Sequence, residues 1–288
     1  MKAKVYKIQF IEALQDICDV MEAESFFYLI LEDKFQLKRI DLALNPDFTF
    51  SEKDIQEWKL ILEELKKEKP IQYILGTTEF FGLPFTVNEN VLIPRPETEE
   101  LVEWIVNEVS TVEKSKAIKI LDIGTGSGCI AIVLAKNLPT ARVFAIDVSK
   151  KALEVAKKNV EINSVSVTFL EKNILETDDL VEQFDIIVSN PPYVRNLEKQ
   201  EIKKNVLENE PHLALFVDDL DALLFYRKIA SLATKNLNHG GKLYFEINQY
   251  LGKEMLELLQ EFGFSDIELR KDIYGNDRMI RAIWNNLC

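Results

Sequence analysis

Apolar residues recur at two different spacings along the chain, and the first spacing predicts helices. Behind a capping-box start at Ser51, apolar side chains follow at helical intervals: Ile55, Trp58, Leu62 and Leu65. Pro70 ends this segment, and no clear strand-like run precedes it. We therefore predict that residues 1–75 form a small helical bundle.

The pattern changes after residue 75. Residues 76–87 contain alternating apolar positions, two glycines and a proline, which predicts a hairpin or an extended linker. Pro96 is placed to open a helix that continues through Leu101 and Ile105. Residues 76–95 are therefore a connector between domains, or equally a wall of the active site that presents Arg95 between two prolines.

From residue 118 onward, strands and helices alternate. We predict strands at about 118–121, 142–146, 165–170, 184–189 and 242–247, and a closing hairpin at about 266–271 and 278–284. Helices are expected at 129–137, after a cap at Ser149, and at about 220–237 and 251–262, with His239 as a cap at a helix end. This alternation predicts an α/β fold built on a parallel sheet.

The apolar strand at 184–189 runs directly into Asn190-Pro191-Pro192-Tyr193, called here the Asn-Pro-Pro-Tyr turn. Two prolines end the strand and stiffen the turn, and the carboxyl ends of central strands are where open α/β sheets bind ligands. The Asn190 amide, the carbonyls and the Tyr193 ring suit a small planar NH2 group, either an amide or an exocyclic amine. The alternative is an ordinary turn that only terminates the strand.

A glycine-rich turn follows the first strand of the α/β segment, with Gly124, Gly126 and Gly128 ahead of a helix and Asp147 at the end of the next strand. Such a turn brings backbone N–H groups close to a ligand, and an acidic residue at that place grips ribose hydroxyls. Cys129 stands where a dinucleotide fingerprint would have its last glycine. The spacing therefore favours a nucleoside without phosphates, such as S-adenosylmethionine, and Asp122 would attract its cationic amino-acid group. A purely structural turn is the alternative.

Composition narrows the possible partners. The 288 residues carry a net charge of −13, which argues against a protein that works on duplex nucleic acid. A local basic patch is still compatible with this overall charge. Two histidines and no Cys/His cluster predict no metal site. Three cysteines without a C-x-x-C pair, no export signal and no long apolar run predict a cytoplasmic protein without disulfides or membrane spans.

Several motifs together resemble the PrmC/HemK group of protein-(glutamine-N5) methyltransferases, which modify class-1 peptide chain release factors. They cover almost the whole chain: 73–76, 81–85, 92–99, 122–128, 190–193, 210–215, 271–272, Gly275 and 277–278. The Asn-Pro-Pro-Tyr turn is shared with amino-methyltransferases of adenine and cytosine, whereas Ile93–Glu99 and Glu210–Leu215 are more specific.

The resemblance implies a helical substrate-docking domain (1–75), a hairpin or linker (76–95) and a methyltransferase domain (96–288). The latter would be Rossmann-like, with seven mostly parallel strands, the last one antiparallel. S-adenosylmethionine would be bound by Asp122, Gly124, Thr125, Gly126, Ser127, Gly128, Asp147, Asn173, Ile174 and Asn190. Asn190, Pro191, Pro192 and Tyr193 would hold the substrate glutamine, with Asn190, Pro191 and Tyr193 as the catalytic residues. The family usually has Asp at position 173, Gly at 248 and a glycine-containing loop at 217–219, so this chain departs from it there.

We hypothesise that the enzyme catalyses methyl transfer mainly by holding the substrate amide in the reactive orientation. The substrate NH2 would donate to the Asn190 side-chain oxygen and the Pro191 carbonyl, and Tyr193 would stack on the amide plane. No general base stands out, and His212 is interpreted as structural. The protein is expected to be a monomer. Rival interpretations are an amino-methyltransferase of nucleic acid, a nicotinamide-dependent oxidoreductase and a non-catalytic binding protein.

Overall fold

A computed structural model describes residues 1–110 and 117–285. Cys288, one of the three cysteines considered above, lies outside this range. The chain divides into two compact units. One comprises Met1–Gly76 together with Lys203–Asn209, and the other comprises Thr77–Ile202 and the chain from Glu210 onward.

The first unit is helical, as predicted for the start of the chain. Its elements are α1 (Ala3–Glu12), α2 (Val20–Phe35), α3 (Arg39–Leu44), α4 (Glu52–Lys66), α5 (Ile71–Leu75) and, from later in the chain, α9 (Lys204–Asn209). The fully buried Trp58 of α4 forms the centre of the core and stacks on Phe27 with ring centroids 4.7 Å apart. The predicted capping box is confirmed, because Ser51 Oγ accepts from Asp54 N and Asp54 Oδ2 accepts from Ser51 N.

The second unit opens with the antiparallel hairpin of β1 (Thr77–Phe80) and β2 (Leu83–Thr86), followed by α6 (Pro96–Ser110). The buried Asn159 joins this hairpin to the rest of the unit. Its side chain accepts from Thr86 N at 2.7 Å and donates to the carbonyls of Thr86 and Ser127.

A seven-stranded sheet forms the body of the second unit. Its strands are β3 (Lys119–Ile123), β4 (Arg142–Asp147), β5 (Val167–Glu171), β6 (Phe184–Ser189), β9 (Leu237–Glu246), β10 (Ser265–Lys271) and β11 (Asp277–Trp284), in the order β10-β11-β9-β6-β3-β4-β5. The ladders β6–β9, β3–β6, β3–β4 and β4–β5 are parallel, and β11 is antiparallel to both of its neighbours. The predicted fold class, including the antiparallel last strand, is confirmed.

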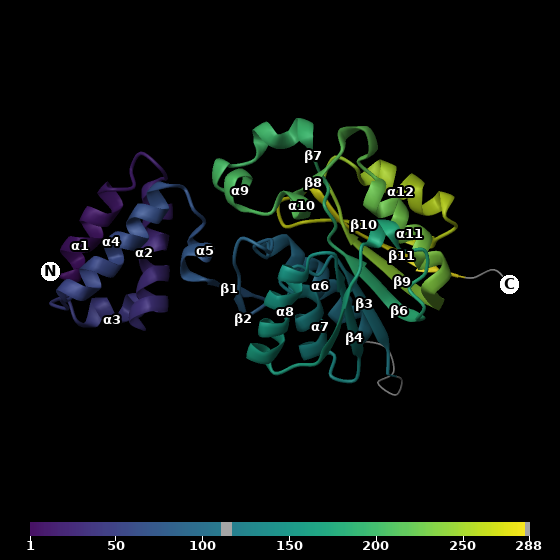
Figure 1. The fold of residues 1–288 in the computed structure, drawn as a ribbon, viewed down its shortest axis with the longest axis horizontal. Helices are drawn as coiled ribbons and strands as arrows, with labels where there is room; N and C mark the ends of the chain where they lie inside the picture. The colour runs from purple at the N-terminus through teal and green to yellow at the C-terminus, as the bar shows by residue number, and fades with distance from the viewer. Residues whose placement is uncertain (111–116, 286–288) are drawn as a thin grey trace. The chain divides into compact units, whose positions relative to one another are not determined.

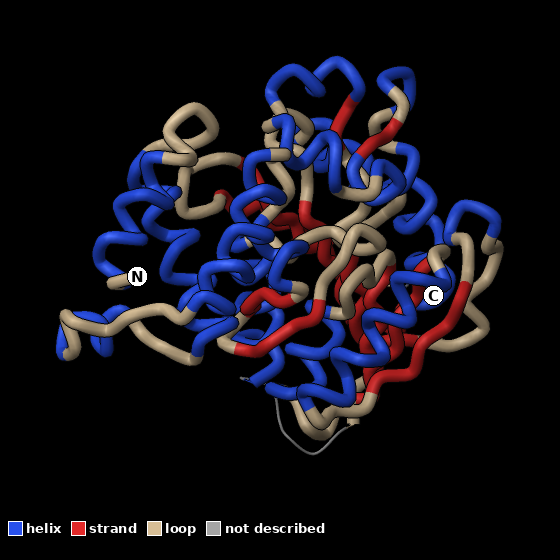
Figure 2. The backbone as a smooth tube through the Cα atoms, turned by 60° about the vertical axis from the view of Figure 1, so that its left-hand side comes forward, coloured by secondary structure: helices blue, strands red, loops and turns tan. Residues whose placement is uncertain are grey.

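Helices cover both faces of the sheet, and Figure 2 shows the strands in red between them. On one face lie α6, α7 (Cys129–Asn137) and α8 (Lys150–Asn163), and on the other lie α11 (Leu224–Asn236) and α12 (Gly252–Glu261) (Figure 1). Side chains alternate between the two cores with the strand period of two: Ile186 and Val188 pack toward α7, whereas Ile187 packs toward α11. Burial on both faces explains why these strands read as continuous apolar runs.

Two sequence interpretations need correction or completion. His239, predicted to cap a helix, lies inside β9, which begins at Leu237 and has an irregular register against β6 between Phe184 and Ile186. Short elements between the Asn-Pro-Pro-Tyr turn and α11 were not predicted: β7 (Val194–Arg195), α10 (His212–Leu215), β8 (Phe216–Val217) and the 3-10 turns Asn196–Glu201 and Asp219–Asp221. A further 3-10 turn, Ile174–Glu176, lies between β5 and β6 and was not predicted either.

Candidate active site

The strand order reverses direction between β3 and β6, and this is where the second unit places its candidate site. Gly124 follows β3 and Asn190 follows β6, so both leave the sheet at the same edge. A Cβ added at Gly124 would lie 4.0 Å from the Asn190 carbonyl oxygen. The glycine-rich turn and the Asn-Pro-Pro-Tyr turn are therefore neighbours in space.

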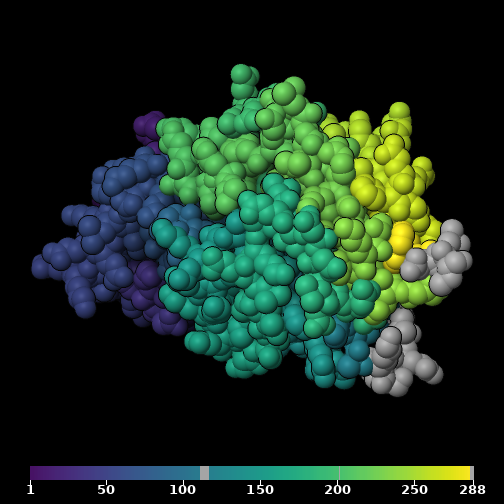
Figure 3. Space-filling model, turned by 45° about the vertical axis from the view of Figure 1, so that its right-hand side comes forward, coloured from purple at the N-terminus to yellow at the C-terminus, as the bar shows by residue number. Residues whose placement is uncertain are grey.

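A cavity of about 260 Å³ opens at this edge. Eight of the residues predicted from the sequence line it: Gly124, Gly126, Asp147, Asn173, Ile174, Asn190, Pro191 and Pro192. A second cavity of about 50 Å³ is lined by Tyr193, Arg95 and Glu246 among others, and Asn190 and Pro191 line both cavities. In the space-filling view, the green surface near residues 190–220 adjoins the teal surface near 140–175, and both stretches contribute residues to the larger cavity (Figure 3).

The glycine-rich turn is held in shape by its own polar contacts. Gly124 and Gly128 adopt φ angles of +77° and +83°, which residues with a side chain rarely adopt. A Cβ on Gly128 would also meet Ile132 Cδ1 at 3.0 Å and Ala156 Cβ at 3.1 Å. The Asp147 carboxylate accepts from Gly126 N at 2.9 Å and from Ser149 N at 2.8 Å, so it braces the turn at the mouth of the cavity. Burial raises its pKa.

Four predicted cofactor residues lie beneath the cavity surface. Asp122, Thr125, Ser127 and Gly128 do not line the cavity. Asp122 is completely buried; its Oδ2 accepts from the Thr125 hydroxyl at 2.6 Å, and within the described residues its Oδ1 has no hydrogen-bond partner. Desolvation raises the Asp122 pKa to about 7, with a further contribution from Asp147.

Several lining residues escaped the sequence analysis: Asn90, Val91, Leu92, Val148, Ser149, Lys172, Leu175, Pro211, Leu213, Phe225 and Ile229. Leu92 belongs to the 92–99 motif, and Phe225 and Ile229 lie four positions apart on one face of α11, so a helix-face analysis would have paired them. Pro211 and Leu213 belong to the 210–215 motif, Leu213 within α10, and Leu175 lies in a 3-10 turn. The remaining residues come from loops that only the folded sheet brings together.

The two more specific motifs contact each other. Arg95 donates to Glu210 Oε1 at 2.6 Å, and the backbone N–H of Ile93 donates to Glu210 Oε2 at 3.2 Å. The Glu210 side chain is only 1% exposed, so Arg95 and the Ile93 N–H supply the hydrogen bonds that a buried carboxylate needs. A residue 115 positions away therefore holds Arg95 at the small cavity.

The Asn-Pro-Pro-Tyr turn is fastened from three sides. Asn190 Nδ2 donates to Thr98 Oγ1 at 3.3 Å, and the Tyr193 hydroxyl donates to Glu246 Oε1 at 3.0 Å. Asn248, at the position where the family usually has glycine, donates to the Tyr193 carbonyl at 3.0 Å and to Glu198 at 2.9 Å. Its side chain therefore fills a structural role at this departure from the family pattern.

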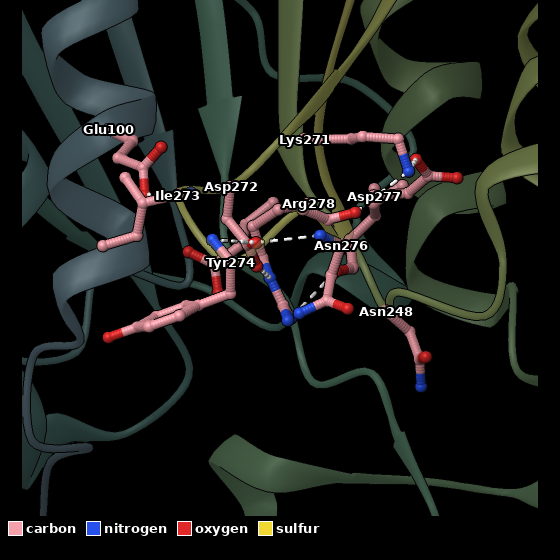
Figure 4. Close-up of polar contacts among 12 residues, drawn as sticks. Glu100, Asn248, Lys271, Asp272, Ile273, Tyr274, Asn276, Asp277 and Arg278 are labelled. Atoms are coloured by element: carbon pink, nitrogen blue, oxygen red, sulfur yellow. Dashed lines mark hydrogen bonds and ion pairs between the residues drawn. The ribbon is translucent and has the colours of Figure 1, made fainter.

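The hairpin that joins β10 to β11 is braced at the same edge of the sheet. Asp272 accepts from the backbone N–H groups of Tyr274 and Asn276 and from Arg278 Nε, and Arg278 Nη1 lies 3.5 Å from the Ile247 carbonyl (Figure 4). The Asp272 side chain is fully buried, while Tyr274 is exposed. Arg278 interacts electrostatically with Tyr193 and Glu246, so the hairpin contributes to the electrostatics of the small cavity.

Two absences concern only the part of the chain that the structure describes. It contains no group of three or more His, Cys, Asp or Glu side chains arranged to hold a metal ion. None of its helices combines the length and apolar character that a bilayer crossing requires.

A Rossmann-like sheet in this order, with a cavity between the glycine-rich turn and an Asn-Pro-Pro-Tyr turn, defines the protein as a methyltransferase. Its sequence matches the family models of the methyltransferase small domain over residues 107–214 and of the PrmC N-terminal domain over residues 9–76. The chain belongs to the release factor glutamine methyltransferase family.

Two curated relatives illustrate the similarity. A protein of Flavobacterium psychrophilum named release factor glutamine methyltransferase is 66% identical over 98% of this chain and 99% of its own length. One of the same name from Bacteroides thetaiotaomicron is 46% identical over 94% of this chain and 96% of its own. Among solved structures, the hMettl16 catalytic domain in complex with an RNA hairpin has a TM-score of 0.54 at 19% identity, covering 71% of this chain and 76% of that one, and supports the fold alone.

Proposed function

We propose that the protein transfers a methyl group from S-adenosylmethionine to the side-chain amide nitrogen, N5, of the glutamine in the Gly-Gly-Gln motif of class-1 peptide chain release factors. The observation that carries this proposal is the position of Asn190 and Pro191, which line both cavities. A group held by these residues in the small cavity would therefore lie beside a ligand bound in the large one. The names of the relatives, which cover nearly the whole chain, supply the substrate class.

The lining of the large cavity fits a nucleoside cofactor without phosphates. Ile123, Ile146 and Ile174 offer apolar surface for a base, and Asp147 offers carboxylate oxygens for ribose hydroxyls. Gly124 and Gly126 carry no side chain, so the cofactor would approach their backbone closely. S-adenosylmethionine supplies an electrophilic methyl group when bound there. Asp122, Thr125, Ser127 and Gly128 would act from below by shaping the turn, and Asn173 by its place beside Ile174.

The residues of the Asn-Pro-Pro-Tyr turn would prepare the acceptor. An amide nitrogen is a weak nucleophile because its lone pair is delocalised into the carbonyl. The Asn190 side-chain oxygen and the Pro191 carbonyl would accept the two N–H groups of the substrate and fix the direction of its nitrogen. Tyr193, anchored through its hydroxyl, would support the amide plane, and Pro192 would stiffen the turn. Positioning and oriented dipoles would supply most of the rate.

The remaining assignments belong to the same proposal. Residues 1–75 would help to hold the release factor, 76–95 would connect, and 96–288 would catalyse. The protein would act as a monomer in the cytoplasm, without a metal and without nucleic acid as a substrate.

The direct test is transfer of label from methyl-labelled S-adenosylmethionine to a purified bacterial release factor. Label should depend on the motif glutamine and disappear when that residue is alanine. Asn190→Ala should lower kcat by about 100-fold, the size of effect seen when one positioned dipole is removed. Label on RNA or DNA and none on the release factor would favour the rival nucleic acid amino-methyltransferase. Unchanged kcat in Asn190→Ala would refute the role of the turn.

A further inference from the structure

Glu246 lines the small cavity, where the acceptor is proposed to bind, without belonging to any motif used above. It is the last residue of β9, and it is 1% exposed. Both of its carboxylate oxygens accept hydrogen bonds: Oε2 from the Thr98 hydroxyl at 2.6 Å and Oε1 from the Tyr193 hydroxyl at 3.0 Å. One carboxylate is thereby tied to α6 and to the Asn-Pro-Pro-Tyr turn together.

The proton count at Thr98 determines how the Asn190 amide must face. A hydroxyl has a single proton, and Thr98 gives its proton to the Glu246 carboxylate, which can only accept while it is ionised. Toward Asn190, the Thr98 oxygen is therefore an acceptor, and the group that meets it at 3.3 Å must be the NH2 of the amide. The Asn190 oxygen then points away from Thr98.

This orientation matters because a substrate amide presents NH2 as well. When the Asn190 oxygen points toward the substrate, this oxygen accepts a hydrogen bond from the NH2 group of the substrate amide. If the Asn190 amide turned over, two NH2 groups would face each other, and a buried donor without an acceptor costs about 1–3 kcal/mol. The negative charge on Glu246 excludes the turned-over form. If Glu246 were neutral, its carboxyl group would donate to the Thr98 oxygen, and the Thr98 hydroxyl could then donate to the Asn190 oxygen instead.

We infer that Glu246 is a positioning residue for methyl transfer: through Thr98 it sets the direction of the Asn190 amide, and through the Tyr193 hydroxyl it fixes the ring beside it. The inference rests on the proposed transfer to an amide nitrogen. It assigns to Thr98, within the 92–99 motif, the role of the link between the two side chains.

The surroundings of Glu246 set the pH at which this arrangement fails. Burial raises the pKa of Glu246 above the ordinary 4.5, and hydrogen bonds from Thr98 and Tyr193 oppose that rise. The titratable or charged groups that interact with it come from α6, α7, the Asn-Pro-Pro-Tyr turn, α11 and β11: Glu97, Cys129, Tyr193, Tyr226 and Arg278. Protonation of Glu246 should release the Asn190 amide, so kcat should fall on the acid side.

The first experiment removes the link and restores it. Thr98→Val keeps the shape of the side chain and deletes the hydroxyl, so kcat should fall by about 10- to 100-fold. The Kd for S-adenosylhomocysteine should stay within about 2-fold, because the orientation of the Asn190 amide concerns the substrate glutamine. Thr98→Ser should restore kcat. Tyr226→Phe is the matched control, because it deletes a buried hydroxyl that donates to the backbone carbonyl of Glu246 and not to its carboxylate, and its kcat should remain near that of the wild type.

The second experiment uses the pH profile of kcat, which a purely structural role would leave unchanged. The wild type should lose activity as the pH falls through the pKa of Glu246. Glu246→Gln should be slow at every pH and should lack that limb.

Equal kcat in Thr98→Val and the wild type, or an acid limb that persists in Glu246→Gln, would overturn the inference. Should Thr98→Val not fold, the profile of Glu246→Gln decides alone. If the wild type itself does not methylate the release factor, the proposed function fails instead.

Discussion

Changing Asp122 to asparagine should make the ligand-free protein more stable as the pH rises, relative to the wild type. Asp122 is fully buried beneath the glycine-rich turn, and only one of its oxygens is hydrogen-bonded within the described residues. Its ionised form therefore carries a desolvation cost that the neutral amide avoids. Cofactor binding should weaken in the same variant, because the negative charge predicted to attract a cationic amino-acid group is gone.

The magnitude follows from the pKa. Desolvation raises the Asp122 pKa from 3.8 to about 7. Below pH 3.8 the carboxyl group is protonated in the folded and unfolded states, so there is no cost. Between the two values the folded state holds more protons, and the free energy of unfolding falls as the pH rises. The cost reaches about 2 kcal/mol at pH 5.5 and about 4 kcal/mol above pH 8, since each pKa unit corresponds to about 1.4 kcal/mol.

The assay is urea denaturation of the wild type and Asp122→Asn at pH 5.5 and pH 8.5, followed by circular dichroism. The stability difference between the two proteins should change by about 2 kcal/mol in favour of the variant over this range. Any fixed cost of the new amide cancels in that comparison. Glu103→Gln, the same chemical change on the exposed face of α6, should show no such trend. If the stability difference between the two proteins did not change with pH, the proposed desolvation cost of the ionised Asp122 carboxylate would be refuted.

Three further predictions concern the framework of the second unit. Glu108 accepts from Trp104 Nε1 at 2.8 Å and is paired with Lys242 and with Arg281, and its pKa is lowered to about 2. Glu108→Gln should cost about 2–3 kcal/mol at pH 7 in urea denaturation, and the deficit should shrink as the pH falls from about 4.5 toward 2; a pH-independent deficit would contradict this. Gly128→Ala should cost about 1–3 kcal/mol, because the added methyl group meets close neighbours at a positive φ; an unchanged Tm would be the contrary result. Asn159→Ala should cost about 2–3 kcal/mol and weaken S-adenosylhomocysteine binding in calorimetry, since its bond to the Ser127 carbonyl supports the glycine-rich turn; full affinity would show that the turn stands alone.

The sequence predicted best those elements whose signal is local. The strand at Phe184–Ser189 and the helix at Cys129–Asn137 were placed with their observed bounds, because buried apolar runs, prolines and glycines mark their ends. Short elements such as β7 and β8 were missed. Each has two residues and pairs with the other across residues 196–215, so neither carries a periodic pattern.

The candidate site divides in the same way. The glycine-rich and Asn-Pro-Pro-Tyr turns can be recognised in the sequence, because unusual residues follow directly after predicted strands. Glu246 and Thr98 do not, since a carboxylate at the end of a strand is unremarkable until a residue 148 positions away is seen to donate to it. Asn248 was visible only as a departure from a family pattern, and its bond to the Tyr193 carbonyl explains what the side chain does.

The wide separation of Thr98, Asn190 and Glu246 along the chain has a consequence for biosynthesis. Chains fold as they leave the ribosome, N-terminal segments first. The three parallel strands that carry the glycine-rich turn and Asp147 are complete by Glu171, whereas β9 has to join the sheet before Glu246 reaches Thr98. A nascent chain would thus acquire the cofactor turn early and the means to orient Asn190 only near the end of its synthesis. Catalytic competence would be the last property to mature.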